Sequence, residues 1–175
     1  ALIFTGVSPI LGLRIAWLDL HWISGLLLTF LVVAHIIRAS FWQDFKSMLL
    51  VPKDFGEPFD SSRKPGKYYF EQKGMHWAVT VVTLAVIVTG VLMFMQIDTP
   101  FWDRTNSMAE DQLGLVFLLH GLSTLALVAL AATHIYFALR PEKIYYTRAM
   151  ISGWMSEDEL AANHDPAQWS PKEAD

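Results

Sequence analysis

The stretch LGLVFLLHGLSTLALVALAATHIYFAL, residues 113–139, decides the fold of this 175-residue chain. Its 27 residues include no Asp, Glu, Lys or Arg, which is typical of a helix that crosses a membrane. His120 and His134 lie within it, fourteen positions apart. At about 100° and 1.5 Å per residue, both imidazoles face nearly the same side of the helix, about 21 Å apart along its axis. We therefore expect one histidine near each membrane surface.

An earlier apolar segment repeats this spacing, because His21 and His35 are also fourteen positions apart. The predicted membrane spans are residues 18–38, 75–97 and 113–139. They predict an all-α fold, a transmembrane helical bundle with three complete spans in a single membrane domain, residues 1–175. Residues 1–17 begin without methionine, in the middle of an apolar segment. We expect them to be the end of a preceding helix and the sequence to be a fragment.

Composition narrows the classes of site and partner. Hydrophobic residues make up 53% of the chain and charged residues 17%, which favours a membrane protein embedded in a lipid bilayer. The chain has no cysteine, which excludes disulfides, thiolate zinc sites, iron–sulfur clusters and covalently attached haem. Any metal or cofactor must therefore be held by histidine. The net charge of −4 offers no basic surface for nucleic acid. No catalytic residue is predicted, so substrate turnover is expected in another chain.

The basic residues predict the orientation. Residues 39–74 carry six basic residues, whereas residues 98–112 carry one arginine against four acids. The positive-inside rule then makes residues 39–74 a cytoplasmic loop, residues 98–112 a periplasmic loop and residues 140–175 a cytoplasmic tail. One intervening span makes the two histidine-bearing helices parallel, so their histidines match in height. The outer pair is His21 with His120, and the inner pair is His35 with His134.

These histidines favour a haem interpretation. A neutral imidazole without a partner in hydrocarbon costs about a few kcal/mol, so four of them require a common partner. A b-type haem takes two axial imidazoles from facing helices and fills the apolar space between them. Arg38 and Arg140, at the inner ends of the spans, are candidate partners of haem propionates. Two alternatives stay open: hydrogen bonds to neighbouring helices in a haem-free membrane anchor, or a proton- or ion-conducting path.

Other residues in the chain admit simpler interpretations. His76 opens the second span, where it either lines a quinone pocket or extends to the membrane interface. His164 lies in the polar tail, and we expect it to be solvated. Thr89 and Gly90 are interpreted as ordinary small residues of a membrane helix.

Three motifs then suggest a family: KYYFEQKGMHW (67–77), VTGVLMF (88–94) and LHGLSTLALVALAATHIYFAL (119–139). With them, nearly the whole chain resembles the cytochrome b, or gamma, subunit of membrane-bound formate dehydrogenases and its relatives in nickel–iron hydrogenases and thiosulfate reductases. The resemblance implies a four-helix anchor that holds two b haems, here without most of its first helix. It also implies a multi-pass, non-catalytic redox subunit of the bacterial inner membrane. Such a subunit passes electrons from an iron–sulfur subunit, itself joined to a catalytic subunit, to quinone near the inner haem.

The resemblance also assigns site residues. It makes His21 and His120 the ligands of the outer haem iron and His134 one ligand of the inner haem iron. In that family the other inner ligand comes from the first helix, whereas His35 here occupies the height at which it could serve, and both options stay open. The KY..EQK stretch corresponds to the lining of the quinone pocket. The candidates there are Tyr69, Gln72, Lys73 and His76.

Overall fold

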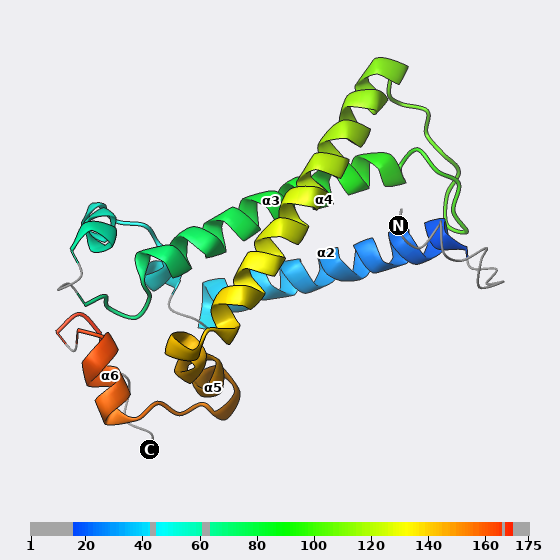
Figure 1. The fold of residues 1–175 in the computed structure, drawn as a ribbon. Helices are drawn as coiled ribbons and strands as arrows, with labels where there is room; N and C mark the ends of the chain where they lie inside the picture. The colour runs from blue at the N-terminus through cyan, green and yellow to red at the C-terminus, as the bar shows by residue number, and fades with distance from the viewer. Residues whose placement is uncertain (1–15, 43–44, 61–63, 166, 170–175) are drawn as a thin grey trace. The chain divides into compact units, whose positions relative to one another are not determined.

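The structure is a computed structural model that describes residues 16–42, 45–60, 64–165 and 167–169, and within these ranges all regular structure is helical (Figure 1). Three helices are long and apolar enough to cross a membrane. They are α2 (Trp17–Trp42), α3 (Phe70–Phe94) and α4 (Glu110–Leu139). The prediction of an all-α transmembrane fold with three spans is confirmed.

The long helices carry their apolar side chains on the outside. They contain 26, 25 and 30 residues, and at about 1.5 Å per residue each exceeds a hydrocarbon core about 30 Å thick. Val116 is the one hydrophobic residue buried within the described part of the chain. Exposed leucine, valine and phenylalanine along whole helices suit contact with lipid, where a backbone bonded within its own helix leaves no polar group unsatisfied.

Helix α3 begins earlier than expected. The predicted span started at residue 75, but the helix starts at Phe70 and ends at Phe94, three residues before the predicted end. The first backbone N–H groups of a helix have no partner inside the helix and need an acceptor. The Glu57 carboxylate accepts from the Phe70 N–H at 2.9 Å, and the Gln72 side-chain oxygen accepts from the Tyr69 N–H at 2.9 Å. These two caps explain why the helix extends into the predicted loop.

The predicted loop over residues 39–74 is shorter and more ordered than expected. Helix α2 continues to Trp42, and two 3₁₀ segments follow, η1 (Phe45–Met48) and η2 (Pro52–Phe59). The Trp77 indole N–H donates to the Met48 carbonyl at 3.0 Å, so η1 is tied to α3. Asp54, at the start of η2, accepts from the Val51 N–H at 2.9 Å. Polar contacts therefore fold this segment against α3.

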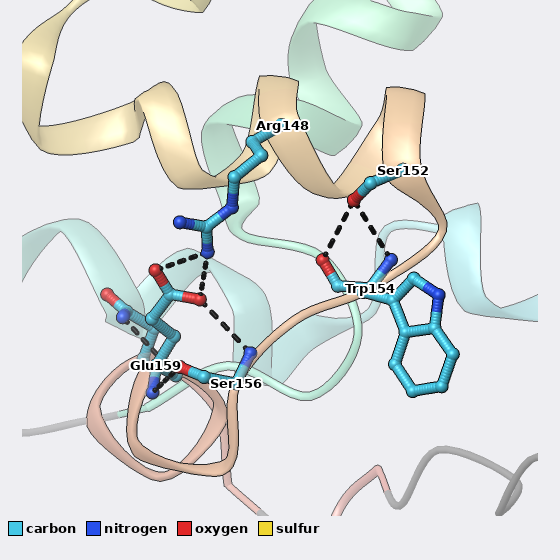
Figure 2. A network of polar contacts seen from close by, with 6 residues as sticks. Arg148, Ser152, Trp154, Ser156 and Glu159 are labelled. Atoms are coloured by element: carbon cyan, nitrogen blue, oxygen red, sulfur yellow. Dashed lines mark hydrogen bonds and ion pairs between the residues drawn. The ribbon is translucent and has the colours of Figure 1, made fainter.

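The polar tail forms three short helices: η3 (Pro141–Lys143), α5 (Ile144–Ser152) and α6 (Glu157–Asn163). Helix α6 begins with a capping box, because Ser156 and Glu159 each accept from the other's backbone N–H. Figure 2 shows the Glu159 carboxylate also facing the Arg148 guanidinium, with which it forms an ion pair. The tail sequence thus encodes local structure of its own.

The expectation that His164 is solvated was wrong, because its side chain is about 1% exposed. The ring Nδ1–H donates to the Gly66 carbonyl at 2.7 Å, and Nε2 accepts from the Tyr146 hydroxyl at 3.1 Å. A buried polar group is tolerated when it is hydrogen-bonded, and here both ring nitrogens are satisfied. His164 therefore fixes the tail to the segment that precedes α3.

The chain divides into two compact units. The first comprises Ala1–Gln43 and Leu84–Ser123, and the second comprises Asp44–Thr83 and Thr124–Asp175. The first unit therefore includes α2, the end of α3 and the first half of α4. The second includes the start of α3, the end of α4 and the tail.

Candidate cofactor site

The first unit brings His21 on α2 and His120 on α4 together. Their ring centroids lie 6.1 Å apart, and the ring planes form an angle of 83°. Because a metal–imidazole bond is about 2 Å long and the ring centre lies about 1 Å behind the nitrogen, two imidazoles on opposite sides of one metal ion have centroids about 6 Å apart. The observed separation therefore fits one metal ion between the two rings.

Helix α3 holds the His120 ring on one side. The Thr89 Oγ1 lies 2.9 Å from His120 Nδ1, and a Cβ added to Gly90 would lie 3.3 Å from His120 Cε1. Within the described part of the chain, no hydrogen bond reaches the ring of His21. The His120 ring is therefore held by α3, whereas the His21 ring has no hydrogen-bond partner among these residues.

The surroundings of the two rings fit a haem better than a metal ion bound by protein alone. Among the described residues, no three His, Cys, Asp or Glu side chains gather as metal ligands, so His21 and His120 supply two ligands only. A porphyrin provides the remaining ones. A Cβ added to Gly25 or Gly121 would meet nothing within 4 Å, which leaves open surface for a flat macrocycle beside each ligand. The donors and the space both fit a b-type haem.

Three aromatic rings fix the end of α2 near His21. The Trp22 ring stacks on Phe94 at 5.4 Å, and Phe94 meets Trp102 edge-on at 4.4 Å between centroids. The Trp22 indole N–H also donates to Asp19 at 3.0 Å. This cluster was not predicted from the sequence. The tryptophans were its only signal, and aromatic residues are common at every membrane interface.

The predicted inner histidines lie in different units. His35 is an exposed residue of α2 in the first unit, and His134 is an exposed residue of α4 in the second. Arg38 also lies on α2, and Arg140 follows α4. The Arg140 guanidinium donates to the Glu142 carboxylate at 3.1 Å. The haem ligands, inner and outer, and the propionate partners stay predictions.

The predicted quinone residues lie at the start of α3, where they contact other protein groups. The Tyr69 hydroxyl donates to the Asn163 carbonyl at 3.0 Å, and the Gln72 side-chain oxygen caps Tyr69. The Lys73 ammonium pairs with Asp54 at 2.8 Å, with side chains 9% and 2% exposed. His76, on the next turn, has its ring centroid 5.9 Å from that of Trp77.

A cluster of tyrosines adjoins this region in the second unit. The Lys143 ammonium lies 4.2 Å from the ring centre of Tyr69 and 5.7 Å from that of Tyr146. Burial raises the pKa of Tyr69, Tyr145 and Tyr146 above the usual value. No short sequence motif predicts this cluster. Tyr69 lies about 75 positions before Tyr145 and Tyr146, so contacts between distant segments bring the three rings together.

The chain matches a family model and several curated proteins. A family model described as prokaryotic cytochrome b561 matches residues 1–153. Among curated proteins, the cytochrome b556(fdo) subunits of formate dehydrogenase from Escherichia coli strains K12, O6:H1 and O157:H7 are each 26% identical over 126 residues. That alignment covers 72% of this chain and 52% of each relative, so the chain spans about half the length of the curated relatives it matches. No solved structure gives a significant match.

Proposed function

Because the chain belongs to the prokaryotic cytochrome b561 family, we propose that it is the haem b electron-transfer and anchor subunit of a membrane oxidoreductase complex of the formate dehydrogenase type. The observation that carries this proposal is the 6.1 Å separation of the His21 and His120 rings, on two helices that could each cross a membrane. Two imidazoles this close together on helices of apolar composition suit the axial ligation of a low-spin haem.

The residues of this chain would hold the haem and exclude water from it. His21 and His120 would each donate one imidazole nitrogen, with Gly25 and Gly121 leaving room beside them. His134 would supply one ligand of a second haem, with the other from His35 or from a histidine of a first helix. Arg38 and Arg140 would pair with propionates. A bound b haem would supply a one-electron redox couple.

The proposed partners lie at opposite membrane surfaces. We assign an iron–sulfur subunit, joined to a catalytic subunit, to the periplasmic side near residues 98–112, and quinone to the cytoplasmic side. The support is charge asymmetry, because six basic residues lie within residues 39–74 and one within residues 98–112. The three candidate spans and the prokaryotic family support a multi-pass protein of the bacterial inner membrane, and the charge asymmetry supports a cytoplasmic C-terminus.

The quinone is proposed to bind near the first two turns of α3. His76 and Gln72 would offer hydrogen bonds to a quinone oxygen. Lys73 and Tyr69, which are bonded to Asp54 and Asn163, would instead hold the surrounding segments together without contacting quinone. Replacing His76 with Ala should weaken quinone reduction while both haems remain reducible by dithionite. Unchanged quinone kinetics would contradict this placement.

Haem content tests the proposal as a whole. The purified protein should show a reduced-minus-oxidised absorption spectrum of b-type haem and two haems per chain by the pyridine haemochrome assay. His21→Ala and His120→Ala should each lose one haem, whereas the control His164→Asn should retain both in every folded chain. A colourless wild-type preparation would contradict the proposal and favour a haem-free anchor or an ion path.

A second substitution tests which histidine supplies the other ligand of the inner haem iron. His35→Met in the full-length protein should lose one haem if His35 ligates the inner iron. Retention of both haems with unchanged spectra would assign that position to a first-helix histidine. A low-temperature spectrum that resolves the two haems identifies which one is lost.

A further inference from the structure

Thr89 has an unusually constrained hydroxyl for a residue of an apolar helix. It is 7% exposed, and its Oγ1 lies 2.6 Å from the Ala85 carbonyl oxygen and 3.2 Å from that of Val86. The same Oγ1 lies 2.9 Å from His120 Nδ1 on α4. One hydroxyl thus joins the backbone of α3 to a candidate haem ligand.

The three distances determine where the protons lie. A threonine hydroxyl has one hydrogen to donate and two lone pairs to accept with. A separation of 2.6 Å between two oxygens is that of a hydrogen bond, so the hydroxyl hydrogen points to Ala85. Toward His120 the same oxygen can then only accept. His120 Nδ1 must therefore carry a hydrogen.

The opposite arrangement is disfavoured. If the Thr89 hydroxyl donated to His120, two oxygens would face each other at 2.6 Å without a hydrogen between them. Two lone pairs would then be repelling each other at this distance within an apolar helix. A threonine that bonds the carbonyl four positions before it is also a common arrangement in helices. Both arguments place the hydroxyl hydrogen on the side of Ala85.

The position of the proton determines which nitrogen of His120 binds metal. A neutral imidazole has one N–H and one free lone pair, so Nδ1–H leaves Nε2 as the ligating atom. Metal-bound histidines usually donate their other N–H to an acceptor, which fixes the ring orientation and increases the basicity of the ligating nitrogen. Thr89 supplies such an acceptor.

Gly90 supplies the room that this contact requires. A Cβ at this position would approach His120 Cε1 to 3.3 Å, tighter than most contacts of real side chains. With hydrogen in its place, the His120 ring lies against α3 at the distance that lets Thr89 reach Nδ1. Thr89 and Gly90 therefore together fix the position of the His120 ring against α3.

We propose that Thr89 is a positioning residue that fixes the Nδ1–H tautomer of His120, so that Nε2 is directed to the iron of the outer haem. The proposal rests on the haem function proposed above. A hydrogen bond from Nδ1–H gives the imidazole more electron density, which favours the ferric state and lowers the reduction potential of that haem. Removing the acceptor should therefore raise this potential.

The test compares Thr89→Val, which keeps the shape and loses the hydroxyl, with Thr89→Ser, which keeps the hydroxyl. The matched control is Thr29→Val, because the Thr29 hydroxyl bonds the Gly25 carbonyl of its own helix at 2.8 Å and, among the described residues, no histidine. The full chain is titrated electrochemically, and the potential of each haem is followed by its absorption. Retention of the inner haem reports that the variant has folded.

In Thr89→Val the reduction potential of the outer haem should rise above that of the wild type. If the preference for the ferric over the ferrous state weakens tenfold, the rise is about 59 mV for a one-electron couple. Thr89→Ser should restore it, and Thr29→Val should leave it unchanged. A Thr89→Val protein with both haems and wild-type potentials would overturn the proposal for Thr89 alone, whereas a colourless wild type would overturn the haem function.

A measurement without haem addresses the tautomer directly. In the haem-free chain, ¹⁵N chemical shifts of labelled histidine distinguish protonated from unprotonated ring nitrogens. His120 should be protonated on Nδ1 in the wild type and in Thr89→Ser, and should shift toward Nε2–H in Thr89→Val. An Nε2–H tautomer in the wild type would overturn the proposal whatever the haem content.

Discussion

The two units of this molecule use polar side chains in different ways. In the second unit, Lys73 pairs with Asp54, and both ring nitrogens of His164 bond to other protein groups. In the first, His120 has one bonded ring nitrogen, and no hydrogen bond among the described residues reaches the ring of His21. A polar group whose bonds are all made within the protein marks structure, whereas one in an apolar helix with a free lone pair marks a place for a ligand.

The buried ion pair should give the largest change in stability. Lys73→Met leaves the Asp54 carboxylate charged and buried, and breaking such a pair by removing one partner costs about 3–5 kcal/mol. Denaturant unfolding followed by circular dichroism measures this loss. The double variant Asp54→Leu/Lys73→Met should recover most of it, because a buried pair is often replaced by apolar groups at little cost.

This pair also tests the comparison between units. If Lys73 is structural, the folded fraction of Lys73→Met should keep wild-type haem spectra and a wild-type response to quinone. Altered quinone kinetics in the double variant, at restored stability, would show that Lys73 belongs to the quinone site as well.

His164 should give the next largest effect. Replacing it with Ala removes two hydrogen bonds and leaves the Gly66 carbonyl and the Tyr146 hydroxyl unpaired, each at about 1–3 kcal/mol when fully buried. We expect a net loss of about 2 kcal/mol in the free energy of unfolding, without loss of haem per folded chain. His21→Ala should do the reverse, losing a haem with little change in the stability of the haem-free chain. Equal haem loss in both variants would remove the distinction between the units.

Two glycines of α3 provide a matched comparison of smaller size. At Gly74 an added Cβ meets nothing within 4 Å, so Gly74→Ala should stabilise the helix by about 0.5–1 kcal/mol. Gly90→Ala gains the same helix propensity but pushes the methyl group against His120 Cε1 at 3.3 Å. It should therefore be less stabilising than Gly74→Ala and should shift the spectrum of the outer haem. Identical behaviour of the two variants would argue against the claim that α3 positions the His120 ring.

The sequence predicted the fold because membrane spans are encoded locally. Long uncharged segments suffice to identify α2, α3 and α4, and the haem interpretation followed from the fourteen-residue spacing that His120 and His134 share with His21 and His35. The ends of α3 were less predictable, because Glu57 caps it from thirteen positions away. A charged side chain of a loop gives no local sign that it will cap a helix.

The roles of Thr89 and His164 were not predicted, for the same reason. Thr89 was interpreted as an ordinary small residue because its partner His120 is 31 positions away on another helix. His164 was interpreted as solvated because the tail around it is polar, although its partners are Tyr146 and Gly66. Contacts between distant segments decide both roles, and a single sequence contains no record of them.

The buried tyrosines predict a pH effect at the alkaline end. Burial raises the pKa of Tyr69, Tyr145 and Tyr146 in the folded state above the unfolded value near 10. Their contribution to stability is therefore complete below about pH 10 and is lost as the pH rises toward the folded pKa. Tyrosinate absorbance should lag behind that of the unfolded chain, and Tyr146→Phe should shrink the lag. A titration that coincides with the unfolded one would contradict the burial of this cluster.

The smallest effect is expected at the exposed ion pair of the tail. Hydrogen bonds from the Ser156 backbone and from Arg148 lower the pKa of Glu159 in the folded state. This carboxylate therefore stabilises the start of α6 fully when the pH is above the pKa of Glu159 in the unfolded chain. The stabilisation is lost as the pH falls through the lower pKa of the folded state. Arg148→Ala should leave unfolding at neutral pH nearly unchanged, because exposed pairs contribute little. It should, however, raise the pH at which the tail loosens, measured by proteolysis after residue 140.

Ser156→Ala, which removes the cap of α6, should loosen the tail more than Arg148→Ala, because a lost N-cap weakens a helix directly, whereas an exposed ion pair is screened by solvent. The reverse order would mean that the second unit depends on its surface charges as much as on its buried bonds.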